Sequence, residues 1–300
     1  MNSQGVSMAN PEKRFPENAP GDFFVDSTCI DCDTCRQIAP NVFVEGDGHA
    51  VVHHQPATEN DRRHALHALV SCPTGSIGSL GHDRPTVVMD DFPLPVEEPV
   101  YYCGFNSPKS YGGNSYFIRH PAGNWLIDSP KFLPRLVGKF EALGGIDHIF
   151  LTHRDDVADA HLYAERFGSK RVIHRDELPS QPGAEVVLDG DGPWELAPGF
   201  LAIPTPGHTE GHCVLLFRNR YLFTGDHLDF DRGEQRLTAS PDYCWYSWPL
   251  QTDSMHRLLG YPFEWVLPGH GQRVCLPWEE MQRQLKELVD RMRLGTGEPG

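Results

Sequence analysis

The sequence has 300 residues, which suggests about two domains, and its 26 Lys and Arg against 41 Asp and Glu give a net charge of −15 at pH 7. So acidic a chain argues against binding to a nucleic-acid backbone, and no apolar run approaches the ~20 residues that a membrane-spanning helix needs. Residues 1–20 carry no hydrophobic signal core and are predicted to be a polar tail, which favours a cytoplasmic protein.

Three of the eight cysteines follow C-x2-C-x2-C spacing, and a fourth stands before a proline further along the chain. The first three are Cys29, Cys32 and Cys35, and Cys72 directly precedes Pro73. Thiolates at that spacing can wrap one face of an iron–sulfur cube, and the fourth iron takes a thiolate from elsewhere in the chain. Four thiolates also suit zinc, but zinc sites more often pair two C-x2-C units. We therefore expect these cysteines to hold one [4Fe-4S] cluster.

Residues 21–84 resemble the single-cluster ferredoxins of bacterial type. In two-cluster relatives the run continues as C-x3-C-P, and that added cysteine serves the other cluster. Here Ala39 takes its place before Pro40. The resemblance therefore implies one cluster, and cysteine rather than aspartate at Cys32 implies four irons rather than three. Strands are expected at 41–44 and 50–53, and a helix at 60–70 would deliver the fourth thiolate.

Residues 85–99 are dense in proline and acid and are predicted to link this domain to a second one over residues 100–300. Strands are expected there at 115–119, 125–127, 171–174, 185–188 and 200–203. Helices are expected at 131–143, 159–167 and 277–292. Alternating strands and helices predict a sheet-on-sheet core with helices outside.

The stretch 204–227 has potential metal ligands at both edges of an expected hairpin. Its strands are predicted at 213–217 and 221–224, with Arg-Asn-Arg as the turn. His208 precedes the hairpin and Asp226 follows it. An imidazole and a carboxylate placed in this way can meet at one point beyond the strand ends, where a hard or borderline cation would be held.

Two more predicted strands end in potential ligands. The strand within 263–270 runs into His270, and the strand at 146–152 stops at His153, which is followed by Asp155. A glycine lets the backbone turn sharply after a strand, and one directly precedes each of three of these ligands: His208, Asp226 and His270. We expect these side chains to face a common site.

The motifs PGHT at 206–209, TGD at 224–226 and PGHG at 268–271 together resemble the metallo-β-lactamase fold superfamily, over roughly residues 100–293. The resemblance implies an α+β protein whose second domain is an αββα sandwich. It also implies that His208 binds one metal, that His270 binds a second and that Asp226 bridges both. Asp128, after the strand at 125–127, would orient the metal loop without binding metal.

The main metal loop departs from that family's pattern. The family usually has His-x-His-x-Asp-His, whereas this chain has His153-Arg-Asp155-Asp156-Val157-Ala158. The implied ligands are His153, Asp155, His208, Asp226 and His270. Asp156 and Asp159 are further candidates, and His161 is within reach if the loop is longer. Asp155 or Asp156 is also a candidate base for a metal-bound water.

Three functions remain open at this point. In the first, one or two zinc ions generate a metal-bound hydroxide that attacks an ester, thioester or amide of a small molecule. In the second, a non-haem iron site accepts electrons from the ferredoxin domain, with a redox partner protein as donor, and Asp155 makes that site harder. The third is an electron-transfer or binding module with a vestigial metal site. The metal-dependent hydrolase is our first prediction.

Several other side chains have two interpretations. The aromatic residues of CWYSWP, which are Trp245, Tyr246 and Trp248, can wall a substrate cleft or pack in the core. His212 and His227 are candidates to line the site, and His174 is a candidate to support it. The cysteines outside the cluster motif are predicted to be reduced thiols: Cys103, Cys213, Cys244 and Cys275.

Overall fold

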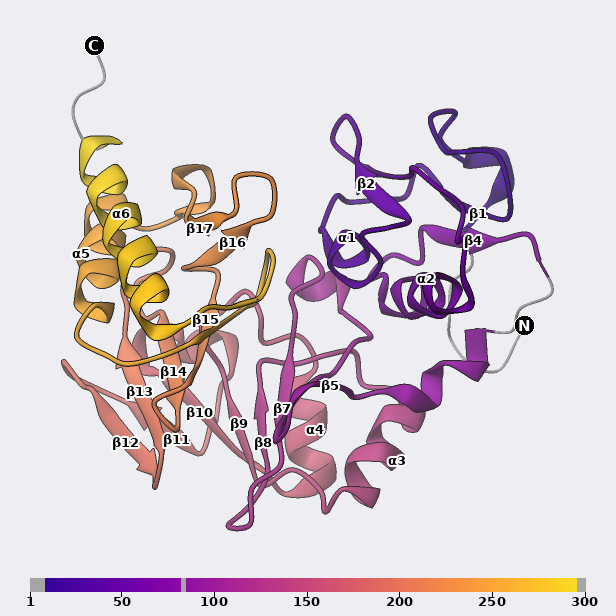
Figure 1. Ribbon diagram of the computed structural model, residues 1–300. Helices are drawn as coiled ribbons and strands as arrows, with labels where there is room; N and C mark the ends of the chain where they lie inside the picture. The colour runs from indigo at the N-terminus through magenta and orange to yellow at the C-terminus, as the bar shows by residue number, and fades with distance from the viewer. Residues whose placement is uncertain (1–8, 82–84, 296–300) are drawn as a thin grey trace. The chain divides into compact units, whose positions relative to one another are not determined.

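The computed structural model describes residues 9–81 and 85–295 (Figure 1). The chain divides into two units, each of which is described by itself below. The first comprises Met1–Asn124 and Ser129–Ile146, and the second comprises Trp125–Asp128 and Asp147–Gly300. The predicted linker at residues 85–99 falls inside the first unit, together with the predicted ferredoxin region.

The N-terminal part of the first unit consists of short strands and two helices. They are β1 (Phe23–Val25), α1 (Thr34–Ile38), β2 (Phe43–Glu45), β3 (Ala50–Val52), α2 (Glu59–Ser71) and β4 (Ile77–Ser79). β1 pairs with β4, and β2 pairs with β3, both antiparallel. At the start of α2, Thr58 Oγ1 accepts the Asp61 N–H at 3.1 Å and the Asp61 carboxylate accepts the Thr58 N–H at 3.2 Å, which is a capping box. The helix ends at Ser71, next to Cys72.

Part of the predicted tail packs on this unit. A short 3₁₀ helix, η1, covers Pro11–Lys13. The Phe15 N–H donates to the carbonyl of Val25 at 3.0 Å, and the Ala19 N–H donates to that of Val52 at 2.7 Å. These bonds fix residues 10–19 beside β1 and β3. Residues 1–8 lie outside the described residues.

The rest of the first unit contains three strands in antiparallel order, β5 (Leu94–Glu97), β6 (Val100–Tyr102) and β7 (Tyr116–Ile118). It also contains α3 (Pro134–Ala142) and the 3₁₀ turns η2 (Pro85–Val87), η3 (Met89–Asp91) and η4 (Pro108–Ser110). β5 lies in the stretch predicted as a linker. α3 begins later than the helix predicted at 131–143, because Pro134 suits the first helical turn, where no N–H is needed.

The second unit holds two layers of strands. The parallel layer has the order β8 (Trp125–Ile127), β9 (His148–Phe150), β10 (Lys170–His174) and β11 (Val186–Leu188). The other sheet has the order β12 (Trp194–Ala197), β13 (Phe200–Pro204), β14 (Cys213–Phe217), β15 (Tyr221–Gly225), β18 (Trp265–Pro268) and β19 (Val274–Cys275). Trp125 of β8 stacks on Phe200 of β13 with 4.5 Å between ring centroids. The two layers therefore pack face to face.

The predicted hairpin is present as β14 and β15. Arg218 and Asn219 in its turn have φ angles of 53° and 51°, which is the left-handed conformation that a tight hairpin turn requires. β18 runs parallel to β15, with Pro268 opposite Gly225. The start of β14 and the ends of β15 and β18 therefore lie at the same end of the strands, which is where the predicted ligands lie.

Helices cover the sheets of this unit. α5 (Trp248–Leu258) and α6 (Trp278–Gly295) lie together on one face of the six-stranded sheet that runs from β12 to β19 (Figure 1). Their buried residues, including Met255 and Leu285, form a single core with Val214 and Val266 of the sheet. α4 (Ala160–Phe167) contacts β10, and β16 (Asp229–Asp231) pairs with β17 (Arg236–Thr238). The predicted α+β fold with sandwiched sheets is confirmed.

No helix within residues 9–81 and 85–295 combines the length and the apolar character needed to cross a membrane.

Candidate metal centre and iron–sulfur site

Ligand atoms from four separate loops meet around Asp226 of the second unit. Asp226 Oδ2 lies 3.6 Å from the Nε2 atoms of both His153 and His208, and 3.9 Å from that of His270. His153 follows β9, His208 precedes β14, and Asp226 and His270 follow β15 and β18. The structure thus brings together the histidines and the aspartate that the sequence motifs singled out.

The two adjacent aspartates of the metal loop face different ligands. Asp155 Oδ2 lies 3.6 Å from His208 Nε2, whereas Asp156 Oδ1 lies 3.8 Å from His270 Nε2. The ligand atoms of His153, Asp155 and His208 all lie within 4.8 Å of one another, as do those of His153, Asp156 and Asp226. The result is two groups of potential metal ligands that share His153, and Asp226 of the second group also lies 3.6 Å from His208 of the first.

The buried polar atoms of these side chains lack partners of their own. Across the described part of the chain, His153 Nε2, His208 Nε2, Asp226 Oδ1 and both carboxylate oxygens of Asp156 find no hydrogen bond. Leaving such atoms buried and unpaired costs free energy, and a bound cation would satisfy them. The donor set of imidazole nitrogens and carboxylate oxygens therefore fits divalent metal ions.

The opposite ring nitrogens fix two of these imidazoles. His208 Nδ1 lies 2.5 Å from the carbonyl oxygen of Tyr243. A carbonyl only accepts, so Nδ1 carries the proton and Nε2 keeps its lone pair towards Asp226. A neighbouring carbonyl or hydroxyl that fixes a ring in this way is usual around metal-binding histidines.

Asp128 acts on His153 through Thr152. The Asp128 carboxylate accepts the Thr152 N–H at 2.9 Å and the Thr152 hydroxyl at 3.0 and 3.1 Å. Because that hydroxyl donates its proton to Asp128, it accepts the Nδ1 proton of His153 at 3.0 Å. His153 Nε2 is then the ring nitrogen that faces Asp226 and is left for a metal ion. This arrangement agrees with the orienting role that the resemblance implies for Asp128.

Negative charge dominates the electrostatics of the site. Burial alone would lower the pKa of His153, but Asp226, Asp156 and Asp128 raise it to about 10. Burial likewise opposes protonation of His270, yet Asp226 and Asp156 raise its pKa to about 9. Burial, together with the charge of Asp226, raises the pKa of Asp156. Cations are therefore strongly favoured here, as protons on the imidazoles or as bound metal.

Two glycines leave space for this arrangement. Gly225 has φ +50°, and a Cβ added there would lie 2.6 Å from His212 Nε2. A Cβ added to Gly269 would lie 2.4 Å from Asp156 Oδ2 and 2.7 Å from Asp226 Oδ1. All three distances are shorter than real side chains tolerate. Both glycines therefore allow close approach, and Gly225 also takes a left-handed turn before its ligand.

His212 and His227 are fully buried next to the ligands. Their rings stack with 4.6 Å between centroids, and the ring of His212 lies 5.1 Å from that of His153. Burial holds the pKa of both imidazoles well below the usual range. They are therefore neutral at physiological pH, and they pack against the candidate metal centre.

Glu177 was not identified from the sequence. It lies in the 3₁₀ turn η5 (Arg175–Ser180) after β10 and is 1% exposed. Its carboxylate accepts the N–H groups of Arg154 at 3.0 Å and of Gly211 at 2.7 Å. It thereby joins the loop of His153 to the loop of His208. Its position after a strand was the only signal, and many acids share that position.

Two candidate residues of the metal loop lie elsewhere. Asp159 is the residue before α4, and His161 is exposed on that helix. Neither belongs to the ligand groups found among the described residues.

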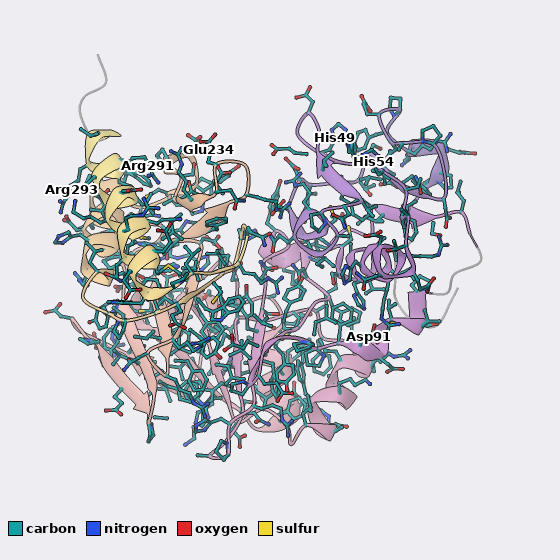
Figure 2. All side chains as sticks on the ribbon, in the orientation of Figure 1. His49, His54, Asp91, Glu234, Arg291 and Arg293 are labelled. Atoms are coloured by element: carbon teal, nitrogen blue, oxygen red, sulfur yellow. The ribbon has the colours of Figure 1, made fainter. Side chains whose placement is uncertain are left out.

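The histidines of the ferredoxin-like region are also outside those groups. Figure 2 labels two of them, His49 and His54, and also Asp91. His67 Nε2 lies 2.6 Å from Asp91, and His49 stacks on Phe15 with 3.6 Å between centroids. His54 packs beside the ring of His53.

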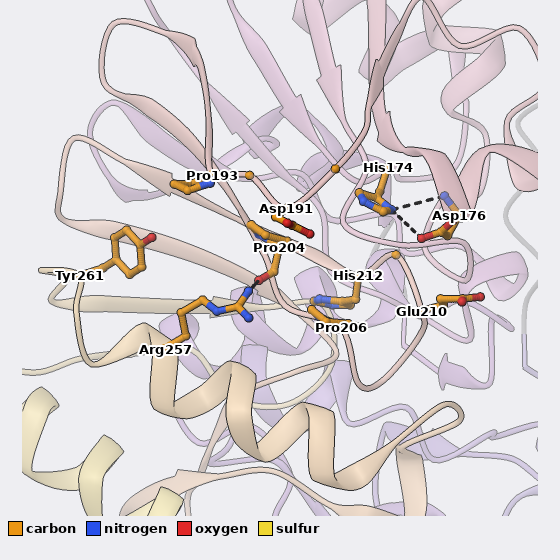
Figure 3. Close-up of a pocket in the computed structure, with 13 residues that line it drawn as sticks. His174, Asp176, Asp191, Pro193, Pro204, Pro206, Glu210, His212, Arg257 and Tyr261 are labelled. Atoms are coloured by element: carbon orange, nitrogen blue, oxygen red, sulfur yellow. Dashed lines mark hydrogen bonds and ion pairs between the residues drawn. The ribbon is translucent and has the colours of Figure 1, made fainter.

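A cavity of about 450 Å³ lies beside the loop of His208 in the second unit (Figure 3). His174 and Asp176 lie at one end, where His174 Nδ1 accepts the Asp176 N–H at 3.3 Å. Arg257 lies at the other end and donates to the Pro204 carbonyl at 2.8 Å. Glu210, two residues after His208, is also part of its lining.

The four cysteines of the predicted cluster come together in the first unit. The pKa of Cys35 is raised well above its usual range, first by burial and then by Cys32, Cys72 and Cys29 nearby. Backbone N–H groups face two of the sulfurs, with Ala50 N 3.5 Å from Cys29 Sγ and Ser76 N 3.3 Å from Cys72 Sγ. Clustered thiols with N–H donors fit the ligation of an iron–sulfur cluster.

The segment 106–114 covers one of these cysteines, Cys32. Asn106 Nδ2 donates to the carbonyl of Gly112 at 2.6 Å and to Thr34 Oγ1 at 3.1 Å. Gly112 has φ +90°, and a Cβ added there would lie 2.8 Å from Cys32 Cβ. The cysteine site is therefore completed by residues outside the region that resembles ferredoxins.

Comparison with known proteins bears on the cysteine region and on the fold. Residues 25–79 match a family described as the 4Fe-4S single cluster domain of ferredoxin I. The structure is similar to that of VMB-1, with 18% identity, a TM-score of 0.52 and coverage of 67% of this chain and 96% of that one. It is also similar to a metallo-beta-lactamase from Pontibacter korlensis, with 17% identity, a TM-score of 0.50 and coverage of 67% and 97%. At these identities the similarity shows the fold. The chain therefore joins a 4Fe-4S domain to a metallo-β-lactamase fold.

Proposed function

We propose that this chain is a metal-dependent hydrolase of a small-molecule ester, thioester or amide. The observation that carries the proposal is that the Nε2 atoms of His153, His208 and His270 all lie within 3.9 Å of Asp226 Oδ2. Asp155 lies next to His208, and Asp156 lies next to His270. Two cations held side by side are a recurrent arrangement for hydrolytic chemistry.

Each ligand has a distinct place in this proposal. His153, Asp155 and His208 would hold one ion, and Asp156 and His270 a second, while Asp226 would contact both. Divalent ions bound there supply Lewis acidity, which polarises a carbonyl oxygen and acidifies water at neutral pH. The chain contributes preorganisation, because hydrogen bonds already orient the imidazoles of His153 and His208 towards the site.

The two adjacent aspartates would take different parts in the reaction. The Asp155 side chain is 48% exposed, and the neighbouring His208, 3.6 Å away, lowers its pKa, so it is ionised at neutral pH and accessible to substrate. Asp156 is 1% exposed and faces His270. In this proposal Asp155 takes the proton from the attacking water, and Asp156 holds His270 in position.

A second candidate function is redox chemistry at a non-haem iron site. The observation that favours it is the share of carboxylates, since Asp155, Asp156 and Asp226 face only three imidazoles. Carboxylate oxygens make a site harder and suit iron better than an all-histidine set does. The cluster of the same chain, with a redox partner protein as donor, would supply the electrons.

Metal analysis of anaerobically purified protein, beside the same analysis of His208→Ala, separates these candidates. The hydrolase predicts about four irons from the cluster and roughly two zinc ions, with only the zinc lost in the variant. Redox chemistry predicts about six irons that fall to about four. Four irons and no other metal in either protein would rule out both enzymes.

A panel of esters, thioesters and amides then tests hydrolysis directly. His208→Ala should abolish turnover, because it removes a ligand, while the visible absorption of the cluster stays intact. His161→Ala is the matched control, since His161 is exposed on α4 outside the ligand groups. Equal turnover in His208→Ala and the wild type would sink the proposal.

A further inference from the structure

An aromatic segment is anchored directly to the candidate metal ligand His208. The carbonyl of Tyr243 accepts the His208 Nδ1 proton at 2.5 Å. The carbonyl of His208 in turn accepts the N–H groups of Trp245 at 3.0 Å and Tyr246 at 3.1 Å. The Ser247 N–H donates to Gly207 at 2.8 Å. The backbone of this segment therefore has a fixed position relative to the ligand.

The segment presents three large rings to solvent. Tyr243 is 66% exposed, Trp245 63% and Tyr246 50%. Trp248 differs, because it packs against the core shared by α5 and α6. From the sequence, the aromatic residues of this motif could either wall a cleft or pack in the core. In the structure Trp245 and Tyr246 are exposed, whereas Trp248 packs against the core. Grouped exposed aromatics on a folded surface usually mark a binding site.

The rings lie beside the metal ligands. The ring of Trp245 is centred 6.0 Å from that of His208, and the ring of Tyr243 meets Trp245 edge-on at 6.4 Å. The Tyr246 hydroxyl donates to Glu210 Oε1 at 3.2 Å, which ties the third ring to the loop of His208. We call Tyr243, Trp245 and Tyr246 the aromatic wall.

We propose that the aromatic wall binds an aryl group in the acyl part of the substrate, next to the carbonyl that is attacked. This rests on the proposed hydrolase. Flat, uncharged rings favour offset or edge-on contact with other aromatic rings, and the adjacent site is occupied by carboxylates and imidazoles that handle the carbonyl. For a thioester, water adds its oxygen to the carbonyl carbon, the C–S bond breaks, and the products are an arylalkyl carboxylic acid and a thiol.

The aromatic wall is tested with two thioesters of the same thiol, one with a phenylacetyl group and one with an acetyl group. Hydrolysis of each is followed by the release of the thiol. The wild type should favour the phenylacetyl compound in kcat/KM, and Trp245→Ala should reduce that preference by about tenfold, chiefly through KM. Trp278→Ala is the matched control, because Trp278 is also exposed, at 38%, but lies at the start of α6. It should leave the preference unchanged.

Binding of the anion of 4-nitrophenylacetic acid gives a measurement that needs no turnover. This carboxylate should quench tryptophan fluorescence in the wild type and in Trp278→Ala. Trp245→Ala should bind it about tenfold more weakly by calorimetry. Trp245→Phe should restore most of the affinity, since it restores a ring.

The outcomes separate the wall from the hydrolase. Aryl binding that depends on Trp245, without hydrolysis of any thioester, would support the wall and refute the enzyme. Equal hydrolysis of both thioesters in the wild type and in Trp245→Ala would refute the wall and leave the enzyme standing. A wild-type dimer that Trp245→Ala converts to a monomer would assign the rings to a second copy of the chain, and would overturn the proposal.

Discussion

Arg154 and Glu177 form a bidentate ion pair, with Nε 2.5 Å from Oε2 and Nη2 3.0 Å from Oε1. The same carboxylate accepts the N–H of Gly211 at 2.7 Å. Arg154 directly follows His153, and Gly211 lies three residues after His208. One buried carboxylate therefore sets the distance between the two loops that carry these histidines.

Glu177→Gln should weaken both the fold and the metal site. Hydrogen bonds to a charged group contribute about 1.5–3 kcal/mol, so we expect a loss of that order in the free energy of unfolding by urea. Support behind metal ligands is typically worth 10–100-fold in affinity, and competition with a chelator should show such a loss. Glu185→Gln is the control, because Glu185 pairs with Arg171 in the same bidentate manner. That variant should keep its metal affinity, and the same affinity in Glu177→Gln would contradict the linking role.

The contribution of Glu177 should depend on pH. Burial opposes its ionisation, but Arg154 and the N–H of Gly211 hold its pKa below the usual value. A carboxyl group with a lowered folded-state pKa stabilises the fold above its unfolded pKa of about 4.3, and this stabilisation is lost as the pH falls through the folded value. The stability gap between wild type and Glu177→Gln should therefore be full at neutral pH and shrink below pH ~4.3. Urea midpoints across that range check it, and a constant gap would be inconsistent with the ion pair.

Gly269→Ala should displace the ligands on one side of the metal centre. The added Cβ would lie 2.4 Å from Asp156 Oδ2, so this carboxylate has to move. We expect the variant to retain about one of two metal ions by elemental analysis, with the iron of the cluster unchanged. Gly260→Ala, whose nearest neighbour would be the Arg257 carbonyl at 3.4 Å, is the control. Full metal content in Gly269→Ala would speak against a second ligand group.

Gly112→Ala should damage the cluster and spare the metal centre. The substitution is strained at φ +90° and places a Cβ 2.8 Å from Cys32 Cβ. We expect visible absorbance per protein to fall by at least half, roughly the effect of losing one well-placed ligand. Gly138→Ala in α3 meets no atom within 4 Å and should keep its absorbance. An intact cluster in Gly112→Ala would show that the covering segment does not constrain the thiolates.

Asp155→His tests whether the carboxylate of Asp155 determines which metal binds. An imidazole is a softer ligand than a carboxylate, so the variant should hold a higher ratio of zinc to iron outside the cluster. Growth in medium with both metals, followed by elemental analysis, measures this ratio. An unchanged ratio would mean that Asp155 does not bind the metal.

The sequence predicted regular elements where apolar patterns were continuous. The strand at 125–127 and the hairpin of β14 and β15 were recognised because apolar runs stop at clear turn residues. α5 was missed, because its polar and aromatic residues after Ser247 show no strong apolar period, and its start depends on the Ser247 side chain and Pro249.

The candidate site was predictable where ligands follow strands. His208, Asp226 and His270 each lie next to an apolar run predicted as a strand. Pairing of these strands brings the three residues together at one end of the sheet. The loop after His153 has no period, and only its folded path decides that Asp155 and Asp156 face different partners.

The cover over Cys32 has a consequence for any attempt to study the ferredoxin-like region by itself. Gly112 leaves no room beside that side chain, and Asn106 ties the cover to Thr34. Both residues belong to the first unit but lie beyond the predicted linker. A fragment cut at residue 99 would therefore lack part of the protein wall around Cys32, and that side of the cysteine site would be open to solvent.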